Sequence, residues 1–287
     1  METRHPVLER LARGQCIVMD GGISSELSRR GYRPAGPLLD AAAAREAPDK
    51  LAAIHRAYID AGADVISAFT ERTTVRALSR GGLGMRAAAL THRAVDIALE
   101  EVQRSGRSVA VAGVLGPLED HARTPSARTL ADEHTEQAGR LATTGCSLVI
   151  VDAMPTLAEA LAATSAARTV LPTVWTTLAL KDRSHLIDGS SLADAATYAA
   201  AVGAQVLLLE SASAADLHAA ANQLSSLAIG VPLGFRSAPA DETQSDRVAN
   251  EMNHALPRAV RVLGGSRTAG GELVRALATR VRARAAA

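Results

Sequence analysis

The chain has 287 residues, 47% of them hydrophobic, which suits one large domain or two small domains with an ample core. Its net charge of +1 excludes a strong overall field that would attract nucleic acid or an anionic membrane. Two cysteines, Cys16 and Cys146, exclude a disulfide framework and fit a reducing cytoplasm. Residues 1–15 lack the apolar stretch of a secretory signal, and no apolar run reaches the ~20 residues that span a bilayer. One tryptophan, three tyrosines and two phenylalanines are too few to build an aromatic cage for a quaternary ammonium ligand.

Eight apolar segments typical of buried parallel strands alternate with helical patterns along the chain. They are residues 17–20, 64–69, 109–114, 147–152, 174–178, 205–210, 229–234 and 260–263. The stretch Leu51 to Ile59 shows the 3.6-residue spacing of a helix, and Gly62 is expected to end that helix before the next strand. Eight such units predict a single α/β domain over residues 1–287, a (β/α)8 TIM barrel, with an open doubly wound sheet as the alternative.

The first strand is followed by Asp20, Gly21 and Gly22, and then by Ser24, Ser25 and Glu26. This order predicts a tight turn and a helix whose first turn is capped by serine and glutamate side chains. Because the functional residues of such a barrel gather at the carboxyl ends of its strands, Asp20 is expected at the mouth.

Charged and polar residues also follow the other predicted strands. They are Thr70, Glu71 and Arg72 after the second strand, Asp152 after the fourth, Glu210 after the sixth, Arg236 after the seventh and Arg267 after the eighth. Unpaired charges in a partly dry cleft are costly, so these groups should pair with one another or with a ligand. The mixture of acids and arginines suits a zwitterion such as an amino acid. Salt bridges that only tie the loops together are the alternative.

The remaining polar side chains give weaker signals. Surface positions are expected for His55, His92, His134 and His218, which lie on predicted helices. The loop residues His121 and His185 are candidates for contact with a substrate. Trp175, early in the fifth strand, is expected in the core.

Five short motifs follow one another in a specific order along nearly the whole chain. They are residues 20–31, beginning Asp20-Gly21-Gly22; residues 61–70; residues 111–117, ending Gly116-Pro117; residues 145–154; and Gly264-Gly265 with Arg267-Thr268. Together they resemble the homocysteine S-methyltransferase family, which includes the betaine-dependent enzymes and the homocysteine module of methionine synthase. The resemblance implies a (β/α)8 barrel, in agreement with the count of strand–helix units.

The resemblance also implies a zinc ion held by three cysteines, one after the sixth strand and two in a Gly-Gly-Cys-Cys turn after the eighth. Here the corresponding residues are Glu210-Ser211 and Gly264-Gly265-Ser266-Arg267. Cys16 and Cys146 lie elsewhere and are expected to be buried small side chains. Serine hydroxyls do not replace thiolates as zinc ligands. The sequence therefore predicts no zinc and no other cofactor.

The amino-acid end of the family's site is better preserved. The resemblance assigns substrate binding to Asp20, Gly21, Thr70 and Asp152, the last being one methylene shorter than the usual glutamate. Glu71 and Arg267 are added as substrate contacts because they follow strands at the same mouth. Glu210 stands at the position of the first cysteine and is the candidate catalytic base.

Three functions remain open at this point. The favoured one is a zinc-independent enzyme that acts on a small amino-acid or thiol substrate, with methyl transfer from an S-methyl sulfonium donor as the expected reaction. A non-catalytic amino-acid-binding or partner protein and a conventional zinc-dependent enzyme are the alternatives. A hard cation such as Mg²⁺ held by the four carboxylates is a variant of the first. The expected partners exclude nucleic acid and membranes and include a second copy of the chain, since the helices at 213–227 and from Glu272 carry apolar stripes.

Overall fold

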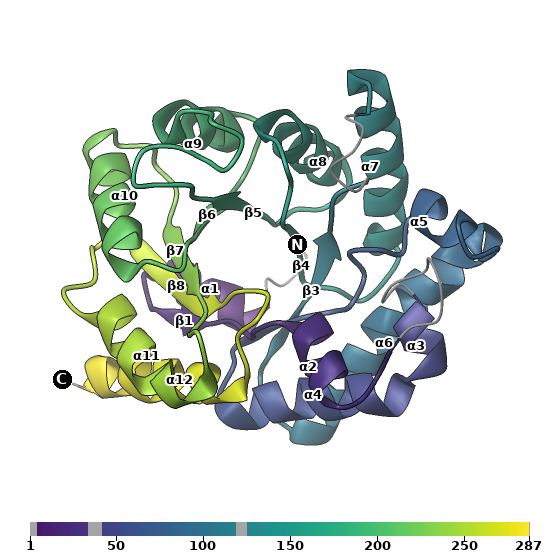
Figure 1. Ribbon diagram of the computed structural model, residues 1–287, viewed down its shortest axis with the longest axis horizontal. Coiled ribbons are helices and arrows are strands. Elements are labelled where there is room, and N and C mark those ends of the chain that lie inside the picture. Colours follow the sequence, from purple (N-terminus) through teal and green to yellow (C-terminus); the bar gives the residue numbers. More distant parts are fainter. Residues whose placement is uncertain (1–4, 34–41, 119–124, 287) are drawn as a thin grey trace.

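The computed structural model describes residues 5–33, 42–118 and 125–286, in which eight parallel strands form a ring surrounded by helices (Figure 1). The strands are β1 (Ile17–Val18), β2 (Val65–Ser67), β3 (Ala110–Leu115), β4 (Leu148–Val151), β5 (Val174–Ala179), β6 (Val206–Glu210), β7 (Leu233–Ser237) and β8 (Val260–Gly265). The helices of the described residues are α1 (Pro6–Ala12), α2 (Ile23–Arg29), α3 (Ala43–Glu46), α4 (Pro48–Ala61), α5 (Val75–Ser79), α6 (Ala87–Ser105), α7 (Ala127–Ala142), α8 (Leu157–Val170), α9 (Leu192–Ala201), α10 (Ala214–Ser226), α11 (Ser245–Asn253) and α12 (Gly271–Ala286), with 3-10 turns at Gly84–Arg86 and Glu242–Gln244.

The ring is closed between its first two strands. The sheet runs in the order β1-β8-β7-β6-β5-β4-β3-β2, so β1 and β2 are its ends. Asp64 N donates to Val18 O at 2.7 Å, and Asp20 N donates to Val65 O at 3.0 Å. A parallel bridge between Met19 and Val65 lies between these bonds. The predicted (β/α)8 barrel is therefore confirmed, and the alternative prediction of an open doubly wound sheet is wrong.

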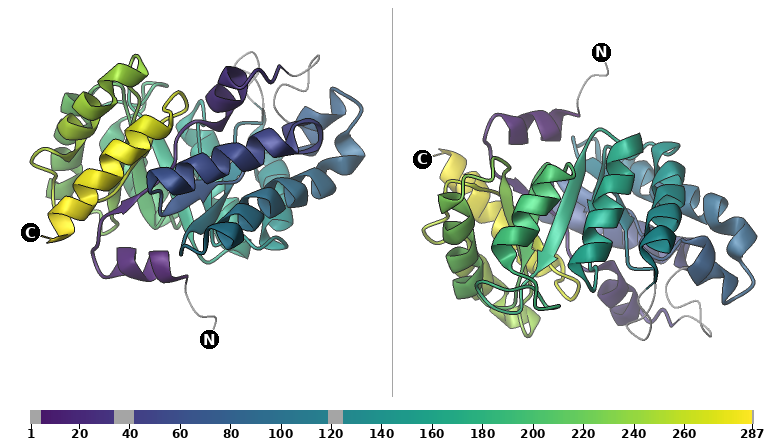
Figure 2. Two further views of the ribbon diagram at one scale, coloured as in Figure 1. Left: turned by 90° about the horizontal axis from the view of Figure 1, so that it is seen from below. Right: turned by 90° about the horizontal axis from the view of Figure 1, so that it is seen from above.

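Two apolar layers hold the barrel together. Inward-facing side chains such as Met19 and Trp175 fill its interior, and Val7, Leu8 and Leu11 of α1 pack against this interior cluster. Figure 2 shows α1 at the end of the barrel opposite to α2. Because α1 covers the end where the strands begin, the end where the strands finish is left for a binding site. The core position predicted for Trp175 is confirmed, since its side chain is buried.

The outer layer is formed by helices whose apolar stripes face the strands. Helix α4 ends where the sequence predicted, at Gly62, which has a φ of +110° that glycine adopts without strain. The surface positions predicted for His55 and His134 are wrong, because both side chains are fully buried. Both lie on the apolar stripes of their helices, and burial lowers the pKa of His55 to about 4. None of the helices in the described residues is both long and apolar enough to cross a bilayer.

Two local predictions also need correction. The seventh strand is Leu233–Ser237 rather than residues 229–234. Positive φ angles at Ala228 and Gly230 and the following Pro232 keep the preceding apolar segment out of the sheet. Arg236 consequently lies inside β7 and does not follow it.

The first turn of α2 also differs from the predicted capping arrangement. Gly22 is the N-cap and makes no side-chain cap bond, and the Ser25 hydroxyl donates to Gly22 O at 3.0 Å. A Cβ on Gly22 would lie only 1.7 Å from Arg267 O, so this close approach of two backbones requires glycine.

Candidate active site

A cavity of about 310 Å³ opens at the carboxyl ends of the strands. Gly21 and Gly22 line it from the turn after β1, Ser67 and Glu71 from the end of β2 and the loop after it, and Asp152 from the end of β4. Arg236 of β7 and Arg267 of the loop after β8 complete the wall. We call this space the mouth cavity. It brings together most of the residues that the sequence predicted for the site.

Asp20 lies next to Gly21 and Ser67, which line the mouth cavity, and only 2% of its own surface is exposed. Its two carboxylate oxygens accept hydrogen bonds from Ser67, at 2.6 Å from the backbone N and at 2.9 Å from the hydroxyl. Burial raises the pKa of Asp20 to about 6, although the bonds from Ser67 and the charge of Arg236 act in the opposite direction. Asp20 is thus a carboxylate fixed in direction, with a pKa raised by burial to about 6.

Arg236 and Asp152 form a buried ion pair beside Asp20. Nη1 of Arg236 donates to Asp152 Oδ1 at 2.5 Å and to Thr177 Oγ1 at 3.2 Å, and Nε donates to Gly265 O at 3.1 Å. Burial favours the neutral acid at Asp152, but the charge and hydrogen bond of Arg236 outweigh it, so the pKa of Asp152 is lowered. Asp152 is therefore ionised and is held by Arg236 of β7 and Thr177 of β5.

Glu210, the last residue of β6, approaches the same guanidinium from another side. Its Oε2 lies 3.3 Å from Arg236 Nη1 and has no hydrogen-bond partner among the described residues. Burial raises the pKa of Glu210 and exceeds the opposing effect of Arg236, while Asp152 adds to the increase. A carboxylate with a raised pKa and an unused oxygen is suited to take up a proton.

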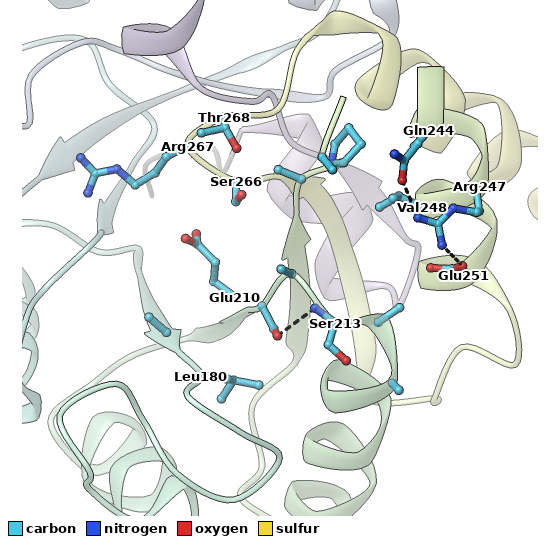
Figure 3. Close-up of a pocket in the computed structure, with 18 of the residues that line it drawn as sticks. Leu180, Glu210, Ser213, Gln244, Arg247, Val248, Glu251, Ser266, Arg267 and Thr268 are labelled. Carbon is cyan, nitrogen blue, oxygen red and sulfur yellow. Dashed lines mark hydrogen bonds and ion pairs between the residues drawn. The ribbon is translucent and has the colours of Figure 1, made fainter. Parts of the chain in front are cut away.

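Glu210 lines a second, larger space. A groove of about 1770 Å³ extends from Glu210 across the ends of β6 and β7 to α11, and Arg267 and Thr268 line both this groove and the mouth cavity. Figure 3 shows the Glu210 carboxylate directed toward Ser266, while Arg247 and Glu251 lie at the far side of the groove. Glu210 therefore lies in the groove, 3.3 Å from the Arg236 guanidinium that lines the mouth cavity.

The other predicted substrate contacts take different positions. Gly21 lines the mouth cavity with its backbone, and a Cβ there would lie 2.4 Å from Ala269 O. The Thr70 side chain does not line this cavity. Its fully buried hydroxyl donates to Val114 O at 2.9 Å and accepts from Val114 N at 2.8 Å, so it connects the end of β2 to β3.

Of the loop histidines, His121 lies outside the described residues. His185 pairs with Asp182 at 3.1 Å and lines neither the mouth cavity nor the groove.

The residues at the ends of β6 and β8 do not fit a zinc ion. Ser211 accepts a hydrogen bond from Ser213 N, and no cysteine lines the mouth cavity or the groove within the described residues. Burial raises the pKa of Cys16 to about 11 and also raises that of Cys146, so both thiols favour the protonated form. The described residues hold no cluster of three histidine, cysteine or carboxylate ligands, and the Arg236 cation lies between Asp152 and Glu210. That cation also opposes a hard metal ion at the same carboxylates.

Sequence reasoning missed two residues that build the site. Ser67 orients Asp20, and its position at the end of the second strand was the available signal. The hydroxyl of Tyr58 on α4 lies 3.0 Å from both Gly22 O and Ala269 O. Tyr58 thereby ties the turn after β1 to the loop after β8, a contact between distant segments that leaves no local sequence signal.

Comparison with known proteins gives a consistent result. The family profile described as Homocysteine S-methyltransferase matches residues 17–281. The Homocysteine S-methyltransferase of Escherichia coli K12 is 28% identical over 247 residues, which are 76% of this chain and 78% of that protein. Betaine--homocysteine S-methyltransferase 1 of Danio rerio is 34% identical over 114 residues, 39% of this chain but only 28% of that protein.

Solved structures agree on the fold. The oxidized form of the homocysteine methyltransferase MmuM from Escherichia coli superposes with a TM-score of 0.82, over 96% of this chain and 99% of that one, at 23% sequence identity. The metallated form of the same protein gives a TM-score of 0.81 at 22% identity.

Proposed function

Because the chain belongs to the homocysteine S-methyltransferase family, we propose that it transfers a methyl group to the sulfur of a small amino-acid thiol such as homocysteine, without zinc. One observation carries the zinc-independent part of this proposal. Glu210, at the end of β6 where the family resemblance leads one to expect a cysteine ligand, lies 3.3 Å from Arg236 of β7. A base and a cation are therefore present where a metal would otherwise activate the thiol.

Three of the predicted contacts have a place in binding the substrate. Asp20, buried beside the mouth cavity, is the acceptor for the substrate ammonium. Arg267 and the backbone at Gly21 line the cavity and suit the substrate carboxylate. Holding both charged groups of the amino acid fixes its α-carbon and leaves its thiol side chain to reach Arg236 and Glu210. Such positioning alone lowers a reaction barrier by several kcal/mol.

The reaction itself is a displacement at carbon. Glu210 accepts the thiol proton, and the sulfur lone pair attacks the methyl carbon of an S-methyl sulfonium donor. A new S–CH₃ bond forms while the donor C–S⁺ bond breaks, and the bonding electrons leave with the donor as a neutral thioether. The proton on Glu210 then passes to water, so the products are two thioethers and one proton.

Turnover in the absence of metal tests the proposal directly. Purified protein with homocysteine, S-methylmethionine and an excess of chelator should form methionine. Glu210→Gln should reduce kcat by about 100-fold or more, as expected for loss of a positioned base. Glu136→Gln is the matched control, because Glu136 lies on α7 and pairs with Arg140 outside both spaces.

The alternatives predict different results. Turnover that requires stoichiometric zinc would restore the conventional reaction. A wild-type protein that binds homocysteine but forms no product with a series of sulfonium donors would leave the binding-protein alternative.

A further inference from the structure

Arg236 is the most deeply enclosed cation of the site, with 6% of its surface exposed. Its Nη1 and Nε atoms are held by groups from the ends of β4, β5 and β8. Burying a guanidinium is costly unless it is paired, and here Asp152 and Glu210 together keep the pKa of Arg236 raised despite its burial. The guanidinium is therefore a permanent positive charge, fixed in direction by the barrel itself.

The two carboxylates use this charge differently. Asp152 is bound to Arg236 by a hydrogen bond of 2.5 Å, whereas Glu210 lies 3.3 Å away without a hydrogen bond from it. Asp152 is thus the permanent partner, which holds the guanidinium in place. Glu210 is the looser partner, and it can lose its charge without breaking a hydrogen bond.

The local charges balance before and after a proton transfer to Glu210. Arg236 and Arg267 both act on Asp152 and on Glu210, so two positive groups face two negative ones. When Glu210 takes a proton from a thiol that reaches Arg236, the negative charge moves from a carboxylate to a sulfur beside the same cations. The main obstacle to forming an anion in a buried site is an uncompensated charge, and this transfer creates none.

We propose that Arg236 holds the reacting sulfur as a thiolate, so that a fixed guanidinium supplies the positive charge for which other thiol-alkylating enzymes use a metal ion. This role rests on the proposed function, since it concerns the activation of the same substrate. It assigns Arg236 to direct contact with the sulfur, Glu210 to the proton and Asp152 to the positioning of Arg236.

The state of the bound thiol tests this role separately from turnover. Homocysteine labelled with ¹³C at the carbon next to sulfur is bound without a methyl donor. The ¹³C chemical shift of the labelled carbon is then followed by NMR as the pH is raised. In the wild-type protein the thiol should ionise at a lower pH than free homocysteine. In Arg236→Gln the ionisation should move up by about one pH unit or more, as expected when a cation within ~4–6 Å is lost. Activity should fall by about 100-fold or more.

Further variants keep the test interpretable. The double variant Asp152→Asn/Arg236→Gln removes both charges of the pair and serves if the single variant fails to fold. Arg236→Lys keeps the positive charge, so it should retain part of the decrease in the thiol pKa. Arg280→Gln, a control at the Asp246 pair between α11 and α12, should behave as the wild type.

The outcomes separate the two proposals. Methionine formation with a bound thiol that titrates identically in wild type and Arg236→Gln overturns the role of Arg236 and leaves the proposed function intact. An Arg236-dependent thiolate without methyl transfer from a sulfonium overturns the proposed function alone. If homocysteine binds to the wild-type protein and its thiol pKa equals that of free homocysteine, the role of Arg236 is also overturned.

Discussion

Both carboxylate oxygens of Asp20 are held by Ser67, through its backbone N at 2.6 Å and its hydroxyl at 2.9 Å. The acid is nevertheless buried, and burial dominates, so its pKa rises from 3.8 to about 6. The site thus contains a carboxylate that is fixed in direction but costly to ionise. Two consequences follow, one for stability and one for binding.

Asp20→Asn should stabilise the free protein at neutral pH. A folded-state pKa near 6 against 3.8 means that the native state binds the proton more tightly than the unfolded state. Asp20 therefore lowers stability above pH 6, by about 3 kcal/mol at ~1.4 kcal/mol per unit, and this penalty disappears as the pH falls toward 3.8. Asparagine keeps an acceptor for Ser67 N and carries no charge. Urea unfolding should show a gain of about 1–3 kcal/mol at pH 7.5 that vanishes near pH 4. An equal stability difference at both pH values would contradict this account.

Binding of an amino acid should depend on the same group. An ammonium needs the ionised form of Asp20, so the affinity for methionine should rise as the pH increases from 5 toward 7. Below pH 6 the dependence should approach tenfold per unit, because binding then requires loss of one proton. Calorimetric titration can measure this directly. In Asp20→Asn, methionine should bind more weakly and with little dependence on pH, and a wild-type affinity that is flat over this range would exclude Asp20 as the ammonium acceptor.

Replacing every cysteine should leave activity unchanged. Cys16 and Cys146 are the only cysteines of the chain, so the variant Cys16→Ser/Cys146→Ser has no sulfur ligand that could hold zinc. Its methyl-transfer rate should lie within about twofold of the wild type. Because both cysteines are partly buried and not fully buried as predicted, the stability cost should be about 1 kcal/mol or less for each. Elemental analysis of both proteins should find no stoichiometric zinc. A large loss of activity together with loss of bound metal would show that one of these thiols serves a metal site.

Gly22 and Gly139 form a matched pair for the close approach at the mouth. A Cβ at Gly22 would meet Arg267 O at 1.7 Å, whereas a Cβ at Gly139, inside α7, meets nothing within 4 Å. Gly22→Ala should therefore cost about 3 kcal/mol or more and displace the loop that carries Arg267, lowering the affinity for methionine. Gly139→Ala should instead stabilise by about 0.5–1 kcal/mol, because alanine favours helix over glycine. Thermal unfolding and calorimetry would reveal the opposite signs.

The fold could be predicted because its main determinant is local and repeated. Each strand is a short continuous apolar segment, and each is followed by a helix with a one-sided stripe, so the eight units can be counted along the chain. The seventh strand was misplaced because Ile229 and Val231 look like strand residues, although Gly230 and Pro232 beside them break extended pairing. The burial of His55 was readable in principle, since Leu51, Ile54 and Tyr58 share its stripe.

The site could be predicted only in part. Strand ends placed Asp20, Asp152 and Glu210 around one mouth, as the structure has them. The sequence could not show that Arg236 stands between two of them, because that depends on the register of β7 against β6 and β8. The sequence also could not show that the Thr70 hydroxyl forms hydrogen bonds to the backbone of Val114 in β3. Contacts across the barrel depend on three-dimensional closure and leave no periodic signal.

The pairing of β1 with β8 has a consequence for biosynthesis. Ile17 pairs with Val262, so the first strand to leave the ribosome has to wait for the last before one of its edges is covered. Gly22 and Ala269, the two carbonyls beneath the Tyr58 hydroxyl, likewise meet only then. Such distant contacts slow folding. A chain that ends before β8 therefore lacks both the closed barrel and the loop with Arg267 that lines the mouth cavity.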